Sequence, residues 1–143
     1  MHQHYSIGAL SRTTGVKIPT IRFYETIGLL PEPSRTASNR RVFGTDAVRR
    51  LQFIRHAREL GFELPAIRQL LALADDPQQS CNAVDAIARA HLREIESRIQ
   101  RLTALQSEMR RMLRQCTRGR IADCRIIEVL GHHAFCVHKH HRS

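Results

Sequence analysis

The sequence predicts a mostly α-helical protein: a winged helix-turn-helix at the N-terminus, then one long helix, then a loop bounded by cysteines. Three observations support this prediction. Two short helical patterns flank a glycine turn before Gly28, and two prolines, Pro31 and Pro33, then interrupt the helical period. Beyond Pro77, residues 81–115 carry a helical pattern with no glycine or proline inside it.

The first two helices are predicted from the residues at their ends. Ser6 is a favourable N-cap for a helix that Gly15 ends, because glycine readily adopts the positive φ of a helix C-terminus. Pro19 stands in the first turn of a second helix, where its missing N–H group costs nothing. This helix runs to Gly28. Two short helices around a glycine turn make a helix-turn-helix pattern.

A basic wing is predicted to follow the second helix. Residues 34–39 have the composition of a turn, and they lie between two short extended pieces within residues 30–43. Residues 40–43 form the expected return strand of this wing.

Two further helices complete the predicted N-terminal part. Thr45 or Asp46 is the expected N-cap of the first of these, and Gly61 ends it. The second runs over residues 64–74 and stops before Asp75-Asp76-Pro77, because a proline disfavours helix at the residue before it. The two helices present apolar stripes of Ala47, Leu51 and Ile54, and of Ile67, Leu70, Leu71 and Ala74.

The long helix over residues 81–115 carries a seam that needs a partner. Apolar residues recur at alternating steps of four and three residues, which is typical of a coiled coil, and Gln106 is the polar position of the seam. A helix outside a domain cannot bury such a seam against itself. The simplest partner is a second copy of the chain, which gives a homodimer. The apolar seam positions are Leu92, Ile95, Ile99, Leu102, Met109 and Leu113.

Charge points to nucleic acid. The 143 residues carry a formal net charge of +10, and all basic residues except Lys17 and Lys139 are arginine, whose planar fork of donors suits phosphates and guanine edges. A hydrophobic fraction of 42% is that of a globular protein. The sequence shows neither an export signal nor a bilayer-length apolar run, so we expect a cytoplasmic location and no membrane partner. Motifs for a serine hydrolase, a phosphate-binding loop or a zinc protease are also missing from the sequence, which argues against an enzyme.

Four segments, taken together, resemble the MerR family of transcriptional regulators. They are Ile21-Arg22-Phe23-Tyr24-Glu25, Gly28-Leu29-Leu30, Leu51-Gln52-Phe53-Ile54-Arg55 and Glu59-Leu60-Gly61-Phe62, and the similarity runs from Ser6 to about Leu130. The resemblance implies a DNA-binding domain over residues 5–75 and a long antiparallel dimerisation helix over residues 80–115. It also implies a metal-binding loop with a short helix over residues 116–131, followed by a His-rich tail, 132–143.

Family members bind double-stranded promoter DNA as homodimers across an overlong spacer. Their effector-loaded form distorts this DNA, so that RNA polymerase can use both promoter elements. The regulator thus acts on RNA polymerase indirectly, through the promoter DNA. The resemblance implies DNA contacts from Lys17, Thr20, Arg22, Tyr24, Arg35, Asn39, Arg40 and Arg41. Many relatives have a glycine and an aromatic residue where this chain has Asn39 and Arg40, and we expect the wing turn to survive because Asn tolerates positive φ.

The cysteines form a candidate metal site only in a dimer. Cys116 and Cys124 bracket a loop in which Gly119 allows the chain to curl, so that both sulfurs face one point. Cys81 lies at the other end of the long helix, about 50 Å away at 1.5 Å per residue, and cannot reach them within its own protomer. In the antiparallel dimer that the resemblance implies, the Cys81 of the second copy lies beside this loop. Two symmetric sites of three thiolates result.

The thiolate count bears on which ion binds. Copper(I)-sensing relatives have a similar loop, Ala122-Asp123-Cys124 followed by Ile126-Ile127-Glu128, but carry Ser at the position of Cys81. A third thiolate suits a divalent ion, Cd, Pb, Hg or Zn, and zinc-sensing relatives usually add a Cys or His inside the loop, which favours the first three. A copper(I) sensor and a thiol-based redox regulator remain alternatives. The His-rich tail with Cys136 is a candidate second metal site or an unstructured segment.

Overall fold

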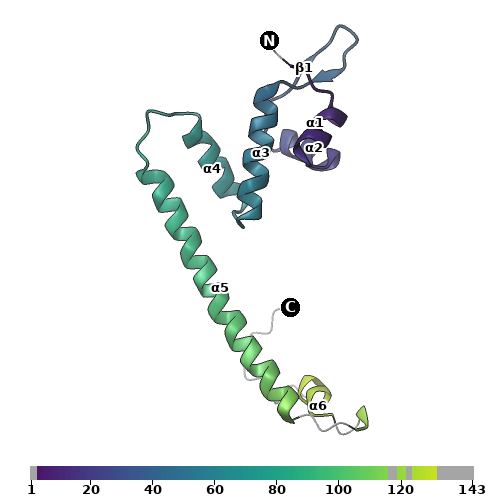
Figure 1. Ribbon diagram of the computed structural model, residues 1–143, viewed down its shortest axis with the longest axis vertical. Coiled ribbons are helices and arrows are strands. Elements are labelled where there is room, and N and C mark those ends of the chain that lie inside the picture. The colour runs from purple at the N-terminus through teal and green to yellow at the C-terminus, as the bar shows by residue number, and fades with distance from the viewer. Residues whose placement is uncertain (1–2, 116–118, 122–123, 132–143) are drawn as a thin grey trace. The chain divides into compact units, whose positions relative to one another are not determined.

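The computed structural model describes residues 3–115, 119–121 and 124–131, and this part of the chain is mostly helical, as predicted (Figure 1). It divides into two compact units, Met1–Arg89 and Ala90–Ser143. In order, the elements are α1 (Ile7–Thr14), α2 (Ile18–Thr26), β1 (Ser34–Arg35), β2 (Arg41–Val42), α3 (Thr45–Glu59), α4 (Leu64–Ala74), α5 (Asn82–Gln115) and α6 (Arg125–Gly131).

The ends of α1 are formed by the predicted residues. The Ser6 hydroxyl accepts a hydrogen bond from the Ala9 N–H group at 3.1 Å, and Gly15 has φ +75°. Pro19 lies in the first turn of α2, also as predicted, but the helix ends at Thr26, two residues before Gly28. The helix-turn-helix prediction is thereby confirmed.

The wing is the hairpin of β1 and β2, which pair antiparallel with Ser34 opposite Val42. Asn39 has φ +63° in the turn, so this residue does replace glycine there, as expected. A further pairing was not predicted: Tyr5 and Phe43 exchange two backbone hydrogen bonds of 2.8 Å. This bridge ties the N-terminal segment to the base of the wing.

The start of α3 differs from the prediction. Thr45 is already helical, Gly44 is the N-cap, and neither the Thr45 nor the Asp46 side chain caps the helix. Gly44 has room at this position, and a glycine N-cap costs only a few tenths of a kcal/mol relative to a capping side chain. The bounds of α4 match the prediction, and Ile67 and Leu71 are buried, but Ala74 is exposed.

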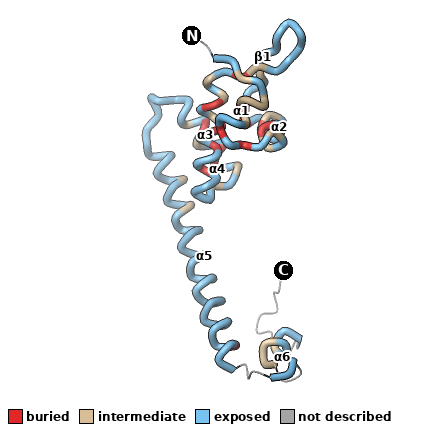
Figure 2. The backbone as a smooth tube through the Cα atoms, turned by 45° about the vertical axis from the view of Figure 1, so that its right-hand side comes forward, coloured by how far each residue is buried: buried red, intermediate tan, exposed pale blue. Residues whose placement is uncertain are grey.

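One hydrophobic core holds the first unit together. It draws on α1, α2, α3 and α4 and on the segment before the wing, and Figure 2 shows the buried residues gathered in these elements. At an order of 1.5–3 kcal/mol for each fully buried aliphatic side chain, this core is the main source of the unit's stability. Its most completely buried hydrophobic residues are Leu10, Ile21, Leu29, Leu30, Leu51, Ile54 and Ile67.

Helix α5, in contrast to the first four helices, is almost entirely solvent-exposed. Its 34 residues form one continuous helix, and Met112 is its one buried residue. The predicted seam is solvent-exposed, with 55% of Leu92, 65% of Leu102 and 59% of Leu113 accessible. Helix α6 lies near the C-terminal end of α5 and contains the half-buried residues Ile126 and Val129 (Figure 1). Over the described residues, none of the helices combines the length and apolarity needed to cross a membrane.

Candidate nucleic-acid interface and metal centre

Helix α2 presents part of the expected DNA-reading surface. Lys17 and Arg22 are exposed and Thr20 is half-buried, so all three reach solvent from the N-terminal part of this helix. Tyr24 differs from the expectation, because only 8% of it is accessible and its ring packs in the hydrophobic core. A contact from this residue to DNA is therefore confined to the small part of the ring that remains exposed.

The wing residues Arg35, Asn39, Arg40 and Arg41 are all exposed. The Arg35 guanidinium donates to the Asn39 carbonyl at 3.1 Å, which closes the turn from one side. The Thr36 hydroxyl accepts from the Arg40 backbone N–H group at 3.1 Å. The wing is thus a small hydrogen-bonded hairpin that carries three arginines on its surface.

Glu25 joins α2 to the wing and was not foreseen from the sequence. Its Oε1 atom lies 3.6 Å from Nη1 of Arg41, and its side chain is only 11% exposed. The two residues line a shallow cleft together with Ile7, Arg22 and Thr26. Glu25 is the one acid in α2, which was the available signal. Arg41 is thus paired with the Glu25 carboxylate of the same chain. The described residues offer no carboxylate partner to Arg22 or Arg40.

Three of the arginines between Arg35 and Arg58 serve the fold. Arg55 donates through Nη1 to the Thr14 carbonyl at 2.7 Å, Arg50 through Nε to the Leu29 carbonyl at 2.8 Å, and Arg58 through Nη1 to the Phe62 carbonyl at 3.0 Å. Thr14 is the last residue of α1, where carbonyls lack intrahelical partners and a cationic side chain can satisfy them, while Leu29 and Phe62 lie in the segments that follow α2 and α3. These three arginines therefore have hydrogen-bond acceptors within the chain.

Gly15 is required where Arg55 approaches the end of α1. A Cβ atom on this residue would lie 2.4 Å from Nη1 of Arg55, and its φ of +75° disfavours other residues. The glycine thus serves both the helix C-terminus and the arginine bond that caps it.

Two of the three predicted metal ligands lie within the described residues. Cys81 is exposed and directly precedes α5, where its carbonyl accepts from the Asp85 N–H group at 2.9 Å. Cys124 is half-buried and directly precedes α6, and its carbonyl accepts from the Glu128 N–H group at 3.0 Å. Cys116 and Cys136 lie outside the described residues.

Helix α5 separates Cys81 from Cys124 along the chain. Cys81 precedes and Cys124 follows the continuous 34-residue helix α5, which is on the order of 50 Å long. The described residues of one chain accordingly contain no group of three potential metal ligands.

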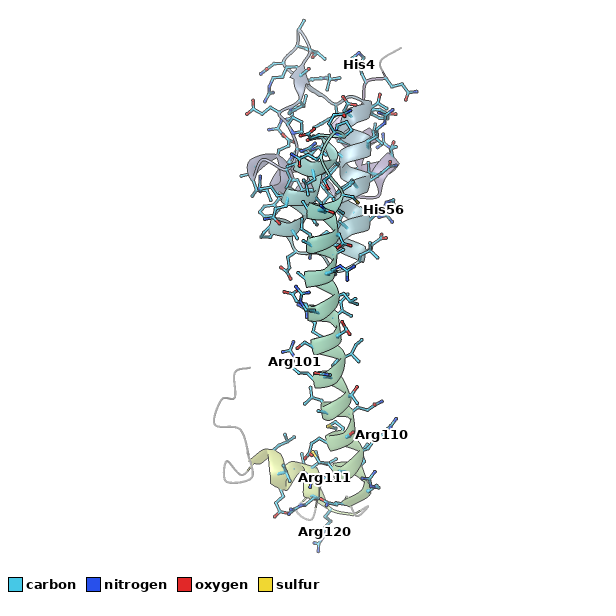
Figure 3. The ribbon with its side chains drawn as sticks, turned by 90° about the vertical axis from the view of Figure 1, so that its left-hand side faces the viewer. His4, His56, Arg101, Arg110, Arg111 and Arg120 are labelled. Atoms are coloured by element: carbon cyan, nitrogen blue, oxygen red, sulfur yellow. The ribbon has the colours of Figure 1, made fainter. Side chains whose placement is uncertain are left out.

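The polar face of α5 is rich in charge. Figure 3 shows the side chains of Arg101 and Arg110 on this helix. The Arg111 guanidinium pairs with Glu108 and donates a hydrogen bond to it, which lowers the pKa of the Glu108 carboxyl and raises the pKa of Arg111. Arg89 pairs with Asp85 at 2.7 Å in the first turns of the helix. The exposed apolar seam is therefore flanked by charged residues, as in a coiled-coil helix.

Comparison with known proteins identifies the family of the chain. The family model "MerR HTH family regulatory protein" matches residues 5–74, and the model "MerR, DNA binding" matches residues 48–112. The transcriptional regulator HmrR of Sinorhizobium medicae is 38% identical over 126 residues, which cover 88% of this chain and 86% of that protein. The "heavy metal-dependent transcription regulator 2" of Rhizobium meliloti is 36% identical over 126 residues, which cover the same shares.

A solved structure is similar over nearly its whole length. The transcription regulator PbrR691 from Ralstonia metallidurans, crystallised in complex with lead(II), superposes with a TM-score of 0.79 at 36% identity, covering 88% of this chain and 98% of that one. These matches span the helix-turn-helix, the wing and the long helix. The chain therefore belongs to the MerR family of helix-turn-helix regulatory proteins.

Proposed function

We propose that this protein is a cytoplasmic, metal-responsive transcriptional regulator that binds double-stranded promoter DNA as an antiparallel homodimer. In this proposal residues 5–75 bind DNA, residues 80–115 form the dimerisation helix and residues 116–131 hold the metal loop. The observation that carries it is the arrangement around α5: a continuous helix with an exposed apolar seam and a cysteine just before its first turn, with two more cysteines beyond its last. Such a helix needs a partner, and an antiparallel partner brings the two ends together.

The DNA-binding half rests on exposure and charge. Lys17 at the N-cap of α2, Arg22 within α2 and Arg40 of the wing are exposed, and the described residues provide none of them with a carboxylate partner. Each cation that meets a phosphate displaces a counterion, so log affinity should fall by about 0.9 per contact for each tenfold rise in salt. We propose the eight residues named from the family resemblance as the DNA contacts, with Tyr24 limited by its burial.

The proposed metal ligands are Cys116 and Cys124 of one copy and Cys81 of the other. Three thiolates suit a soft or borderline divalent ion, so we propose Cd, Pb, Hg or Zn as the effector. The lead(II) complex of PbrR691 supports a heavy-metal effector for this branch. The exposure of Cys81 supports it too, because a ligand supplied to a second copy must be accessible in the single chain.

The proposed activation step begins at the loop. When Cys116 and Cys124 bind an ion, the loop becomes ordered, and the segment that contains Ile126 and Val129 packs against the dimer helix. This packing changes the angle between the two wings, which bends and untwists the spacer at a cost on the order of a few kcal/mol. RNA polymerase then uses both promoter elements, and transcription of metal resistance or efflux genes rises with little change in DNA affinity.

A metal titration coupled to transcription tests this function. Purified RNA polymerase would transcribe from a promoter whose operator is recovered by in vitro selection, with Cd, Pb, Hg, Zn or Cu(I) added in turn. We expect activation by a divalent ion, and loss of one metal per protomer in Cys81→Ser. Loss of a metal ligand should weaken metal affinity by about 100-fold or more. Loss of a residue that only hydrogen-bonds to a ligand typically weakens it by roughly 10- to 100-fold.

Cys136→Ser removes a thiol outside the proposed set, and we expect it to leave the response unchanged. A lost response would place the His-rich tail in the metal site and contradict the set of three cysteines. Release from DNA by metal, without a gain in transcription, would contradict the proposed mechanism. Activation by Cu(I) alone, unaffected by Cys81→Ser, would favour the copper sensor. Iron–sulfur absorbance in the purified protein would favour the redox regulator.

A further inference from the structure

The Arg50 side chain joins two segments that are distant in sequence. From α3, its Nε atom donates to the Leu29 carbonyl at 2.8 Å. Its Nη1 atom lies 3.2 Å from Oδ2 and 3.4 Å from Oδ1 of Asp75. One planar guanidinium thus holds the backbone before the wing and the carboxylate after α4 at the same time.

The two segments lead to the two sites of the proposed function. Leu29 and Leu30 are buried in the core, and the chain goes from them directly into the wing. Asp75 is the C-cap of α4, and residues 76–80 connect it to Cys81 and the start of α5. Arg50 therefore connects the segment that leads to Cys81 with the backbone that leads into the wing.

We propose that Arg50 is a positioning residue that couples the Cys81 end of α5 to the wing, with Asp75 as its partner. This inference rests on the proposed function, because it concerns how metal binding reaches the DNA-binding surface. The geometry favours a coupling role over a stabilising one. Asp75 is 62% exposed and Arg50 26% exposed, and ion pairs this accessible contribute little to stability. The pair therefore adds little to stability, and it lies where it links two segments of the proposed function.

Asp75→Asn tests the coupling most cleanly. It removes the charge of the carboxylate, keeps its shape and leaves the Arg50 bond to Leu29 intact. Asp76→Asn is the matched control, because it makes the same change in net charge one residue further on, and the Asp76 side chain has no partner among the described residues. Any effect of net charge on DNA affinity is thus common to both variants.

Three quantities are measured for each variant: the dissociation constant of the metal, the thermal midpoint and the ratio of transcription with and without saturating metal. We expect the metal affinity and midpoint of Asp75→Asn to match those of Asp76→Asn. The activation ratio should fall by about threefold or more, the scale on which residues between coupled sites act. A residue with a purely structural role would move the midpoint and leave the ratio unchanged.

Arg50→Lys provides a second test. It keeps the positive charge, but a lysine ammonium lacks the planar fork that reaches Leu29 and Asp75 together. The activation ratio should fall as in Asp75→Asn, and the double variant should be no worse than either single one. Hydrogen exchange at residues 34–42 should change on metal binding in the wild type and not in these variants.

The outcomes separate this inference from the function on which it rests. A wild-type protein that responds to no metal ion overturns the proposed function and the coupling with it. A wild type that responds normally, with Asp75→Asn and Arg50→Lys activation ratios equal to that of Asp76→Asn, overturns the coupling alone. A fall in the activation ratio that is additive in the double variant contradicts action through the shared contact.

Discussion

The first unit and helix α5 handle their apolar residues in opposite ways. In the first unit, Leu51 and Ile54 of α3 are completely buried against residues of the same chain. In α5, 65% of Leu102 and 62% of Leu105 are accessible although the helix is long and continuous. The first unit thus has a core within one chain, whereas the apolar residues of α5 are left exposed.

Because of this difference, we expect the folding of the first unit and the assembly of the dimer to be stabilised by different contacts. Burial within one chain stabilises the DNA-binding unit, and burial between chains would stabilise the dimer. Substitutions in the two regions should therefore fail in different ways.

Leu102→Glu should prevent dimerisation. A carboxylate placed in a desolvated seam costs on the order of several kcal/mol per ion, and a symmetric dimer contains two. Sedimentation equilibrium should show a monomer, while circular dichroism still reports a helical first unit. Thr103→Glu adds the same charge one residue away from the seam and should remain dimeric. A dimeric Leu102→Glu protein would show that this face of α5 is not the interface.

Leu51→Ala should destabilise the first unit by about 2–5 kcal/mol, because it leaves a cavity in a fully packed core. Urea denaturation followed by circular dichroism at one protein concentration measures this cost. The folded fraction should still be dimeric, which is the reverse of the behaviour of Leu102→Glu. A cost below about 1 kcal/mol would mean that this core is less complete than its burial indicates.

Gly15→Ala should cost about 1–3 kcal/mol through backbone strain and the displaced Arg55 side chain. Gly44→Ser is its control, because a Cβ atom there has no neighbour within 4 Å, the φ of Gly44 is −97° and serine is a favourable N-cap residue. The thermal midpoints of the two variants measure the difference. Equal midpoints would contradict the role given to the bond between Arg55 and the Thr14 carbonyl.

Glu108→Gln should have the smallest effect. Pairing with Arg111 lowers the pKa of Glu108, so the pair stabilises the folded protein above the ordinary pKa of Glu and loses this contribution as the pH falls through the lowered value. Because both side chains are solvent-exposed, the midpoint at pH 7 should stay the same within error. A clear fall in the midpoint at pH 7 that vanishes in acid would show a stronger pair than its exposure allows.

Local backbone features could be predicted from the sequence alone. Ser6, Gly15 and Asn39 have conformational preferences strong enough to mark a helix start, a helix end and a turn, and all three are found in these roles. The predicted N-cap of α3, Thr45 or Asp46, lies one or two residues after the observed N-cap Gly44, because Thr45 and Asp46 have capping side chains and Gly44 does not. Propensity alone does not decide between adjacent candidates.

The roles of the arginines could not be predicted in the same way. Phosphates, carboxylates and carbonyls all accept hydrogen bonds from a guanidinium, and the carbonyl that Arg55 binds is 41 residues away in sequence. Only the packing of α1 against α3 brings the two together. For the candidate metal site, the sequence supplies the three cysteines and their spacing, and the structure adds the continuous helix between Cys81 and the loop. The partner that completes the site stays a prediction.

A mixed dimer tests the central claim most directly. Cys81→Ser and Cys124→Ser chains, carrying different affinity tags, would be co-expressed, and the dimer that holds one of each would be purified for metal titration. If each site takes Cys81 from one copy and the loop from the other, one end of this dimer is intact. We predict one ion per mixed dimer, bound with wild-type affinity, and no tight binding by either parent homodimer. Absence of tight binding by the mixed dimer would contradict a site shared between antiparallel chains.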